Sequence, residues 1–249
     1  MRFREKVLFA TGAGSGIAAA VAQRFTEEGG LVAVADLNGE NARMVAQKLG
    51  GLALELDVAD ETAVVDAVRT AHEHFGRIDC AFPAAGFADF GPISEWSLER
   101  WNRMLAVHLG GTFLVCREVA PLMRAQGAGS IVNVASIAAI TAQSTNHAYG
   151  AAKGAIAAFS RQLALDLAPE IRVNVLAPGR IRTPMTRPVH VMRGDGDYER
   201  GAKLAAEATV LKRLGTPEEM AATVCFLLSE DAGFITGAVM VADGGETIV

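Results

Sequence analysis

The sequence predicts an α/β protein, with a doubly wound parallel sheet of about seven strands and helices on both faces, in a single domain over residues 1–249. Short apolar runs alternate with longer amphipathic runs along the whole chain. A glycine-rich turn, "TGAGSGIAAA" at 11–20, follows the first apolar run, and no linker or low-complexity run divides the chain. Strands that alternate with helices indicate a parallel sheet covered on both faces.

The first strand is predicted at 6–10, "KVLFA", and the first helix follows because Ile17, Val21 and Phe25 recur every four residues. "LVAVAD" at 31–36 is the second strand. Further strands are predicted at 52–58, 78–86, 130–136, 171–179 and 237–245, and further helices at 40–49, 60–75 (with Asp60 at its start), 97–124, 147–168 and 216–229.

The helix at 216–229 has a capping-box pattern, with Thr216 before Pro217 and a glutamate at the third helical position. The segment 180–212 is rich in Arg, Pro and Gly and is too long for a simple connection. Long excursions of this kind are often lids. We therefore expect 180–212 to be a substrate loop or lid, and the least ordered part of the domain.

The composition excludes several classes of protein. A net charge of −5 gives no support for a nucleic-acid partner or an anionic membrane surface. Cys80, Cys116 and Cys225 are scattered in apolar segments without a C-x-x-C or a Cys/His cluster, which predicts buried, reduced thiols and no metal site. Glu5 and the "TGAG" turn interrupt what could pass for a signal peptide, and no transmembrane helix is expected. We expect a cytoplasmic protein.

The glycine-rich turn is placed where a dinucleotide could bind. Glycines there let the main chain approach a pyrophosphate, and the helix N-terminus attracts its charge. Asp36 ends the second strand, where a carboxylate can accept from ribose hydroxyls and would repel a 2′-phosphate. No Arg or Lys lies within 11–23 or 37–42, so the sequence favours NAD over NADP. Alternatively, Asp36 only caps the next turn. Asp57 could meet the adenine amino group or, equally, share a capping role with Asp60.

The stretch "STNHAYGAAKGA" at 144–155 holds Tyr149 and, four residues later, Lys153, and Ser136 precedes them. On its own, a Tyr and a Lys at i and i+4 are most often an ordinary pair on a helix surface. The order of motifs around them changes this interpretation. "TGAGSGIA", "DVAD", "NVAS", "YGAAK", "NVLAPGRIRTPM" and the C-terminal quarter from "RLGTPEEM" resemble, at matching spacings, the motifs of the short-chain dehydrogenase/reductase family. The resemblance covers nearly the whole chain and implies a Rossmann-type fold.

The resemblance also implies roles. Tyr149 would be the general acid/base while hydride moves at nicotinamide C4, and this requires its pKa to fall by about two to three units. Lys153 would place a positive charge beside the phenolate and hold the nicotinamide ribose. Ser136 would donate to the substrate oxygen. The residues expected to contact the cofactor are Gly12, Ser15, Gly16, Ile17, Asp36, Leu37, Asp57, Val58, Ala84, Ala85, Gly86, Tyr149, Lys153, Pro178, Gly179, Ile181 and Thr183.

Three positions depart from the family pattern. Ala18 stands where a third glycine is usual, and Pro83 stands where the family has an asparagine after the fourth strand. His108 occupies the position of the fourth catalytic residue, an asparagine that helps to hold a water beside the lysine. We expect His108 to be a catalytic residue that holds a water or passes a proton, to be neutral, and to lower activity when it protonates on acidification.

The sequence thus predicts an oxidoreductase that transfers a hydride between NAD and a secondary alcohol or ketone. The alternatives are a catalytically weak, nucleotide-binding regulatory relative, a relative that uses NAD in epimerisation or dehydration, and a carrier-linked 3-oxoacyl reductase. Expected neighbours of the substrate are Ala138, Gln143 and His147, while Arg180, Arg182, Arg187 and Arg193 could recognise an acidic group or simply be solvated. A homotetramer is expected through 97–124 and 147–168, with Phe113, Ala157 and Ala158 as apolar contacts.

Overall fold

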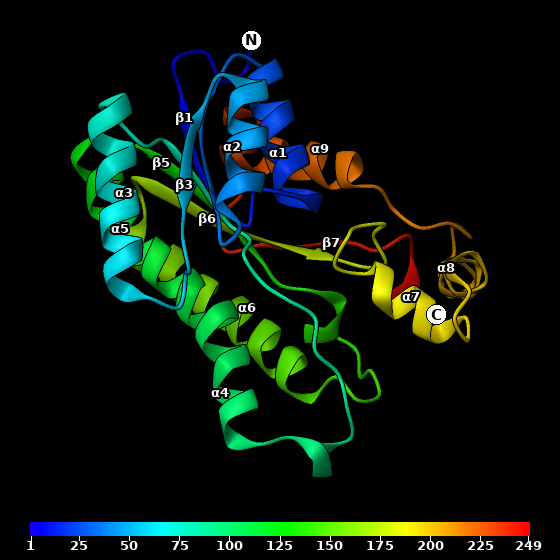
Figure 1. Ribbon diagram of the computed structural model, residues 1–249. Helices are drawn as coiled ribbons and strands as arrows, with labels where there is room; N and C mark the ends of the chain where they lie inside the picture. Colours follow the sequence, from blue (N-terminus) through cyan, green and yellow to red (C-terminus); the bar gives the residue numbers. More distant parts are fainter.

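The computed structural model describes residues 1–249 as one seven-stranded sheet in the order β3-β2-β1-β4-β5-β6-β7 (Figure 1). Every neighbouring pair is parallel, as predicted. The chain reverses its direction of travel across the sheet between β1 and β4, and the carboxyl ends of strands at such a point form a ligand crevice. The strands are β1 Val7–Thr11, β2 Leu31–Asp36, β3 Leu52–Glu55, β4 Cys80–Pro83, β5 Gly129–Val134, β6 Ile171–Pro178 and β7 Val239–Ala242.

Helices cover both faces of this sheet (Figure 1). One layer contains α1 Gly16–Glu27, α2 Gly39–Leu49 and α9 Pro217–Leu228. The other contains α3 Glu61–Phe75, α4 Leu98–Leu105, α5 Gly111–Ala125 and α6 His147–Leu167. The expected capping box of Thr216 and Glu219 is present in α9, and Asp60 caps α3 by accepting from Ala63 N–H at 3.1 Å.

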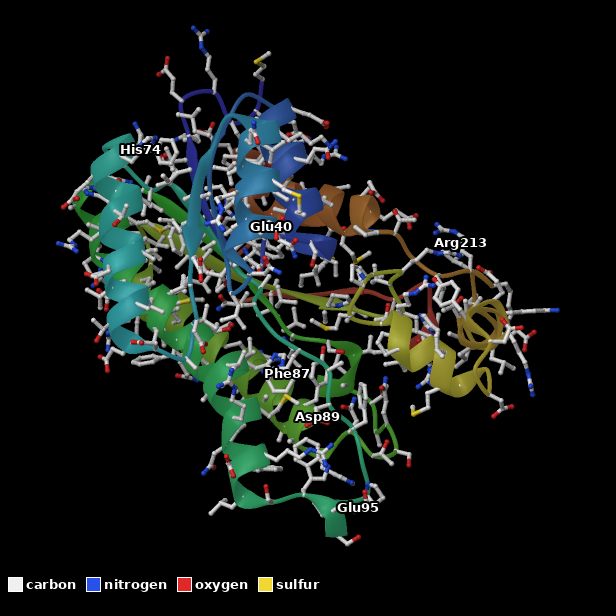
Figure 2. All side chains as sticks on the ribbon, in the orientation of Figure 1. Glu40, His74, Phe87, Asp89, Glu95 and Arg213 are labelled. Carbon is white, nitrogen blue, oxygen red and sulfur yellow. The ribbon has the colours of Figure 1, made fainter.

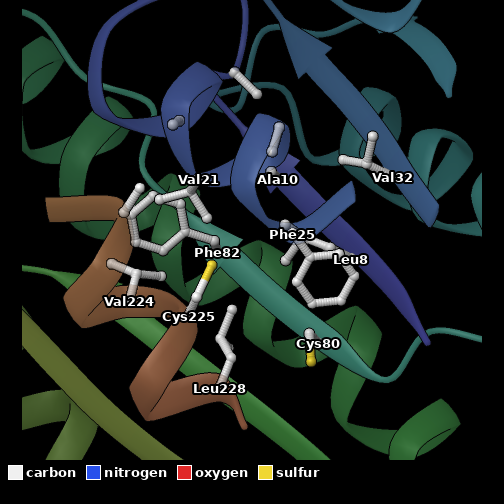
Figure 3. Close-up of a cluster of buried hydrophobic side chains, with 14 of the residues drawn as sticks. Leu8, Ala10, Val21, Phe25, Val32, Cys80, Phe82, Val224, Cys225 and Leu228 are labelled. Carbon is white, nitrogen blue, oxygen red and sulfur yellow. The ribbon is translucent and has the colours of Figure 1, made fainter. Parts of the chain in front are cut away.

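Two hydrophobic cores, one on each face, hold the layers to the sheet. Side chains alternate along β1, so Leu8 and Ala10 join the core under α1 and α9, while Phe9 joins the core under α3 and α5. Figure 3 shows the first core, where Phe25 of α1 and Val224 of α9 gather around β1 and β4. Cys80, Cys116 and Cys225 are unpaired and buried, as expected for them.

The helix expected at 97–124 contains a wider π-helical turn, Ala106–Gly110, which joins α4 to α5. His108 lies in this turn and is buried. The whole helical stretch Leu98–Ala125 is long and apolar enough to pass for a membrane span on length and composition alone, but half of its apolar window is buried within the protein. Such burial is typical of a helix that packs on a core.

The segment 180–212 contains two helices, α7 Arg187–Arg193 and α8 Tyr198–Glu207, which the periodicity analysis did not predict. They pack on each other beside the C-terminus (Figure 1). A Cβ on Gly201 would lie only 1.7 Å from the carbonyl oxygen of His190, so glycine is what lets the two helices touch through their main chains. The segment therefore contains regular structure that the sequence pattern did not indicate, and its role as a substrate loop or lid stays a prediction.

Candidate active site

A cavity of about 820 Å³ opens at the carboxyl edge of the sheet. It is lined by all four predicted catalytic residues, Ser136, Tyr149, Lys153 and His108. It is also lined by each residue that the resemblance assigned to the cofactor, from Gly12 in the first turn to Thr183 after β6. Segments far apart in the sequence thus meet at one crevice.

The glycine-rich turn forms the floor of this cavity by close main-chain contact. Gly12 has φ +65°, and a Cβ there would lie 2.8 Å from Ala85 Cα. Gly16 has φ +59° and begins α1, while Ser15 at the N-cap makes no side-chain capping bond. The first N–H groups of α1 are therefore available to an anion. Ala18 packs its methyl into the core, so the missing third glycine does no harm.

Asp36 lines the cavity and also anchors the turn. One carboxylate oxygen accepts from Gly14 N–H at 2.9 Å and the other from Asn38 N–H at 2.9 Å. The bond from Asn38 N–H caps the turn after β2, as the alternative interpretation expected, while α2 itself is capped by Asn38, which accepts from Asn41 N–H at 3.0 Å.

Asp57 and Asp60 do not share one capping role. Asp57 accepts from Ala59 N–H at 2.9 Å and lies 3.6 Å from the Arg103 guanidinium, and it lines the cavity. Asp60 alone caps α3.

Pro83 does not disrupt the main-chain hydrogen bonding at the end of β4. The next two N–H groups, of Ala84 and Ala85, both donate to the Thr11 hydroxyl at 3.2 and 3.3 Å. Thr11 ends β1 and ties the two central strands together at the cavity floor. Sequence reasoning quoted this threonine in the motif but assigned it no role.

The predicted catalytic residues lie together, with Lys153 and His108 buried and Ser136 and Tyr149 partly exposed to the cavity. Lys153 Nζ donates to the Val134 carbonyl at 2.8 Å and lies 5.5 Å from the centre of the Tyr149 ring. Burial lowers the pKa of Lys153 to about 7. The Ser136 hydroxyl oxygen accepts from Ala138 N–H at 3.1 Å, so its own proton can be donated to the Tyr149 oxygen or to a substrate oxygen.

The pKa of Tyr149 differs from expectation. Burial raises the pKa of its phenol, and the Ser136 hydroxyl opposes that shift. Lys153, whose ammonium donates to the Val134 carbonyl, does not lower the Tyr149 pKa in this arrangement. The expectation of an intrinsically depressed Tyr149 pKa is therefore wrong for this arrangement.

His108 is held by the main chain of Phe87. Its Nε2 lies 3.0 Å from the Phe87 carbonyl oxygen and 3.2 Å from the Phe87 nitrogen, while its buried Nδ1 has no partner. Its ring stands edge-on to Tyr149 with centres 5.3 Å apart. A Cβ on Gly86 would lie 2.3 Å from His108 Cε1, so glycine at 86 makes room for the imidazole.

The surroundings of His108 favour the neutral imidazole, as expected, but they contradict the expected loss of activity through its protonation. Burial, and then the charge of Lys153, lower the pKa of His108 to about 3. The imidazole therefore stays neutral from pH 5 to 9, and its protonation cannot shape activity there. Since Nε2 is taken by Phe87, only Nδ1 can serve a water.

A second cavity of about 470 Å³ adjoins the first and shares residues with it, among them Gly86, Phe87 and Met185. The expected substrate neighbours Ala138, Gln143 and His147 line neither cavity. The segment 180–212, which the sequence also placed beside the substrate, does line the second cavity. The sequence analysis did not name its individual side chains, but Met185, Pro188, Val189 and Met192 follow the i, i+3, i+4, i+7 spacing of one helical face, and this signal could have found them.

The four arginines considered for an acidic substrate also line neither cavity. Arg180 makes two bonds to the Glu246 carboxylate, at 2.9 and 2.7 Å. Arg187 lies over the Tyr198 ring at 4.7 Å. Arg182 and Arg193 are the other two arginines. Because none of the four lines a cavity, the structure does not support recognition of an acidic substrate by them.

Comparisons with known proteins agree with this geometry. Residues 12–247 match the family model described as "Enoyl-(Acyl carrier protein) reductase". The chain is 41% identical to the short-chain reductase protein NovJ of Streptomyces niveus, over 97% of this chain and 94% of that protein. It is 38% identical to a D-threitol dehydrogenase of Mycolicibacterium smegmatis, over 99% and 95%.

Among solved structures, a levodione reductase superposes with a TM-score of 0.96 at 32% identity, covering 100% of both chains. An NAD⁺-bound xylitol dehydrogenase superposes with a TM-score of 0.91 at 34% identity, covering 98% of this chain and all of that one. The likeness extends over the full length and includes both the sheet and the crevice. The chain therefore belongs to the short-chain dehydrogenase/reductase family, as an oxidoreductase that uses a nicotinamide cofactor on alcohols and ketones.

Proposed function

We propose that the protein is an NAD-preferring dehydrogenase/reductase of secondary alcohols and ketones, with Tyr149 as its acid/base. The observation that carries this proposal is that Ser136, Tyr149 and Lys153 line the same cavity as the glycine-rich turn and Asp36. Bound NAD would supply the acceptor for the substrate's hydride. The positive-φ glycines and the uncapped start of α1 fit its pyrophosphate, because they bring the main chain close and leave the first N–H groups of α1 without a side-chain cap.

The chain's own residues divide the remaining work. Ser136 donates its proton to the substrate oxygen and stabilises the charge that develops there. Tyr149 takes the hydroxyl proton in oxidation and returns it in reduction. Lys153 favours the phenolate when its ammonium turns from the Val134 carbonyl toward the phenol. His108 offers Nδ1 to a water, and its Nε2 holds the Phe87 main chain in place.

The preference for NAD rests on charge at the adenosine end of the cavity. Four carboxylates line it, from Asp36, Glu40, Glu55 and Asp57, against two guanidiniums, from Arg43 and Arg103. Arg43, beyond the range considered in the sequence, lies 3.9 Å from Glu55, and Arg103 lies 3.6 Å from Asp57. Both guanidiniums therefore already face carboxylates, and a 2′-phosphate would meet net negative potential.

Two measurements test the proposal. Titration of NADH and NADPH, followed by nicotinamide fluorescence, should show tighter binding of NADH. NADH formation from NAD with a panel of secondary alcohols should show turnover. Tighter NADPH binding would contradict the argument from charge. NADH binding without turnover on any alcohol or ketone would instead indicate the regulatory relative.

We further propose a homotetramer that forms through α5 and α6. Phe113 is 42% exposed and stacks edge-on with Phe159 of α6, while Ala158 and Leu165 are exposed on the same helix. Exposed apolar surface of this kind favours association. Ala157 does not belong to this surface, because it is buried in the core. A monomeric mass by light scattering at micromolar concentration would contradict this.

We also propose a cytoplasmic location, since the three thiols are buried and unpaired. Fractionation of cells that express the tagged protein tests it, and recovery of the protein outside the cytoplasm would contradict it.

A further inference from the structure

The second cavity lies where the part of a substrate that does not react must be placed. It continues from the catalytic cavity through Gly86 and Phe87 on one side and Pro184 and Met185 on the other. Its remaining walls are the segment 86–90, which follows β4, and α7. A molecule whose oxygen meets Ser136 and Tyr149 can therefore extend into this space.

The wall formed by α7 is apolar along one helical face. Met185, Pro188, Val189 and Met192 face the cavity. Met185 is 39% and Met192 is 64% exposed, so both carry apolar surface that a ligand could remove from water. The charged Arg187 lies on Tyr198 of α8 instead. His190 is also turned toward α8, where burial, and then the charges of Arg180 and Arg182, lower its pKa.

The opposite wall is also free of unpaired charge. Phe87 and Phe90 line the cavity, whereas Asp89 between them is bound to Arg100 through two hydrogen bonds. Arg100 donates in addition to the Phe90 carbonyl at 2.8 Å and lies over the Trp96 ring at 4.3 Å. This ion pair lowers the pKa of Asp89, so its carboxylate stays paired. Figure 2 labels Phe87 and Asp89 on this segment, above Glu95.

We propose that the protein selects uncharged alcohols and ketones whose larger substituent is a hydrocarbon chain or ring, and that this substituent binds between 86–90 and α7. The inference rests on the proposed function. Ser15, at the edge shared with the glycine-rich turn, offers this cavity one side-chain hydroxyl. A polyol would leave its other hydroxyl groups without side-chain partners against Met, Val and Phe, which is costly. An anionic substituent would find no free cation on either wall. Methionine side chains adapt to ligands of different shape, so chains and rings both fit.

A series of alcohols tests this selectivity. With NAD in excess, kcat/KM should rise from 2-butanol to 2-octanol by about fourfold for each CH₂ that becomes buried. D-threitol and a sulfonated secondary alcohol should be turned over at least about a hundredfold less efficiently than 2-octanol. A flat series, or preference for either polar substrate, overturns the inference and leaves the alcohol chemistry intact. Absence of turnover on every member, with NAD and with NADP, contradicts the proposed function and this inference with it.

A pair of matched variants locates the effect. Met192→Lys places a charge on the wall and should lower kcat/KM for 2-octanol at least about tenfold, with little change for 2-butanol and for the affinity of NADH. Met44→Lys is the control, because Met44 is 57% exposed on α2 and lines neither cavity. Met192→Gln, of similar size, should give a smaller loss in the same direction. An unchanged preference for 2-octanol in Met192→Lys overturns the proposed placement.

Discussion

The cofactor end of the active-site crevice is built from main chain, whereas the substrate end is built from side chains. At the cofactor end, Gly12 and Gly16 bring the main chain close, and Asp36 ties the turn to β2 through Gly14 N–H. At the substrate end, side chains of Phe87, Phe90 and α7 form the walls. The first end presents N–H groups at fixed positions, whereas the second presents an apolar surface whose shape depends on side-chain rotamers.

This difference indicates how each end can change. A main-chain site tolerates few substitutions at its glycine positions, because a Cβ would occupy the ligand's space or strain the turn. A side-chain site can exchange one apolar residue for another and alter only the fit. We therefore expect substitutions at the cofactor end and the catalytic residues to abolish or redirect activity, and substitutions at the substrate end to change selectivity.

The largest expected effect lies where the two ends meet. Tyr149→Phe removes the only proposed acid/base hydroxyl and should lower kcat about a thousandfold, a barrier increase of about 4 kcal/mol. NADH affinity should change by less than about threefold, which equals about 0.65 kcal/mol. Steady-state kinetics and a fluorescence titration measure the two quantities. Tyr198→Phe is the matched control, because Tyr198 lies in α8 and lines neither cavity. Retained turnover in Tyr149→Phe would remove the proposed role.

The next effect tests the charge of the cofactor end. Asp36→Ala combined with Leu37→Arg should shift the ratio of NADH to NADPH affinity about a hundredfold toward NADPH, about 2.7 kcal/mol. Leu37 is exposed at this position, so an arginine there can reach a phosphate. Leu37→Arg alone keeps the Asp36 carboxylate and should give only part of the shift. Equal ratios in all three proteins would show that Asp36 serves the turn alone, through Gly14 and Asn38.

The sequence predicts the cofactor end well because the glycine-rich turn and Asp36 of that end belong to one continuous stretch of main chain. Gly12, Gly16 and Asp36 lie at spacings imposed by the strand–turn–helix unit, so their order in the chain indicates their place in space. The alternation of strands and helices likewise predicts every strand and both faces of the sheet. Strands buried on both faces are short apolar runs, and most of the helices repeat apolar residues on the face that they bury.

At the substrate end the sequence indicated the segment 180–212, but neither the side chains that line the cavity nor the segment that faces them. Its walls come from 86–90 and from α7, which lie about a hundred residues apart. No local period connects two such segments. The π-helical turn at His108 was also missed, since one wide turn leaves little trace in a helical pattern. The pKa values of Tyr149 and His108 depend on burial, which only the packed structure reveals.

A third prediction concerns the stability that His108 contributes to the substrate end. Its pKa is about 3 in the folded protein and about 6.5 in the unfolded chain, so the unfolded chain binds the extra proton. This contribution is complete above about pH 6.5 and is lost as the pH falls, by about 1.4 kcal/mol per unit, or about 2 kcal/mol at pH 5.

Urea unfolding at pH 8 and pH 5 measures this difference. The lowered pKa of Lys153 also makes the free energy of unfolding fall on acidification, but at higher pH. Because Lys153 is present in wild type and in both variants, its contribution is the same in all of them. Comparison with His108→Asn therefore isolates the histidine, and the variant should lose about 2 kcal/mol less on acidification. His74→Asn on the surface of α3 is the control and should behave as wild type. Equal losses in wild type and His108→Asn would show that water reaches the imidazole.

The smallest expected effect comes from two glycine substitutions. Comparing them distinguishes the cost of backbone strain from the cost of pushing two main-chain segments apart. Gly12 and Gly50 have nearly the same φ, +65° and +66°, so alanine at either position adopts the left-handed conformation at a cost of about 1 kcal/mol. Their surroundings differ. A Cβ on Gly50 meets nothing within 4 Å, whereas one on Gly12 would lie 2.8 Å from Ala85 Cα. Gly50→Ala should therefore lower the free energy of unfolding by about 1 kcal/mol and leave NADH affinity unchanged.

Gly12→Ala should show the same strain and, in addition, push the main chain at Ala85 away from the turn. Ala85 N–H donates to the Thr11 hydroxyl at 3.3 Å, so this movement also loosens the tie between β1 and β4. NADH affinity should fall about tenfold, which equals about 1.4 kcal/mol. If Gly12→Ala binds NADH as Gly50→Ala does, the close approach at the floor of the cavity plays no part in cofactor binding. The cofactor end would then depend on side chains as much as the substrate end does.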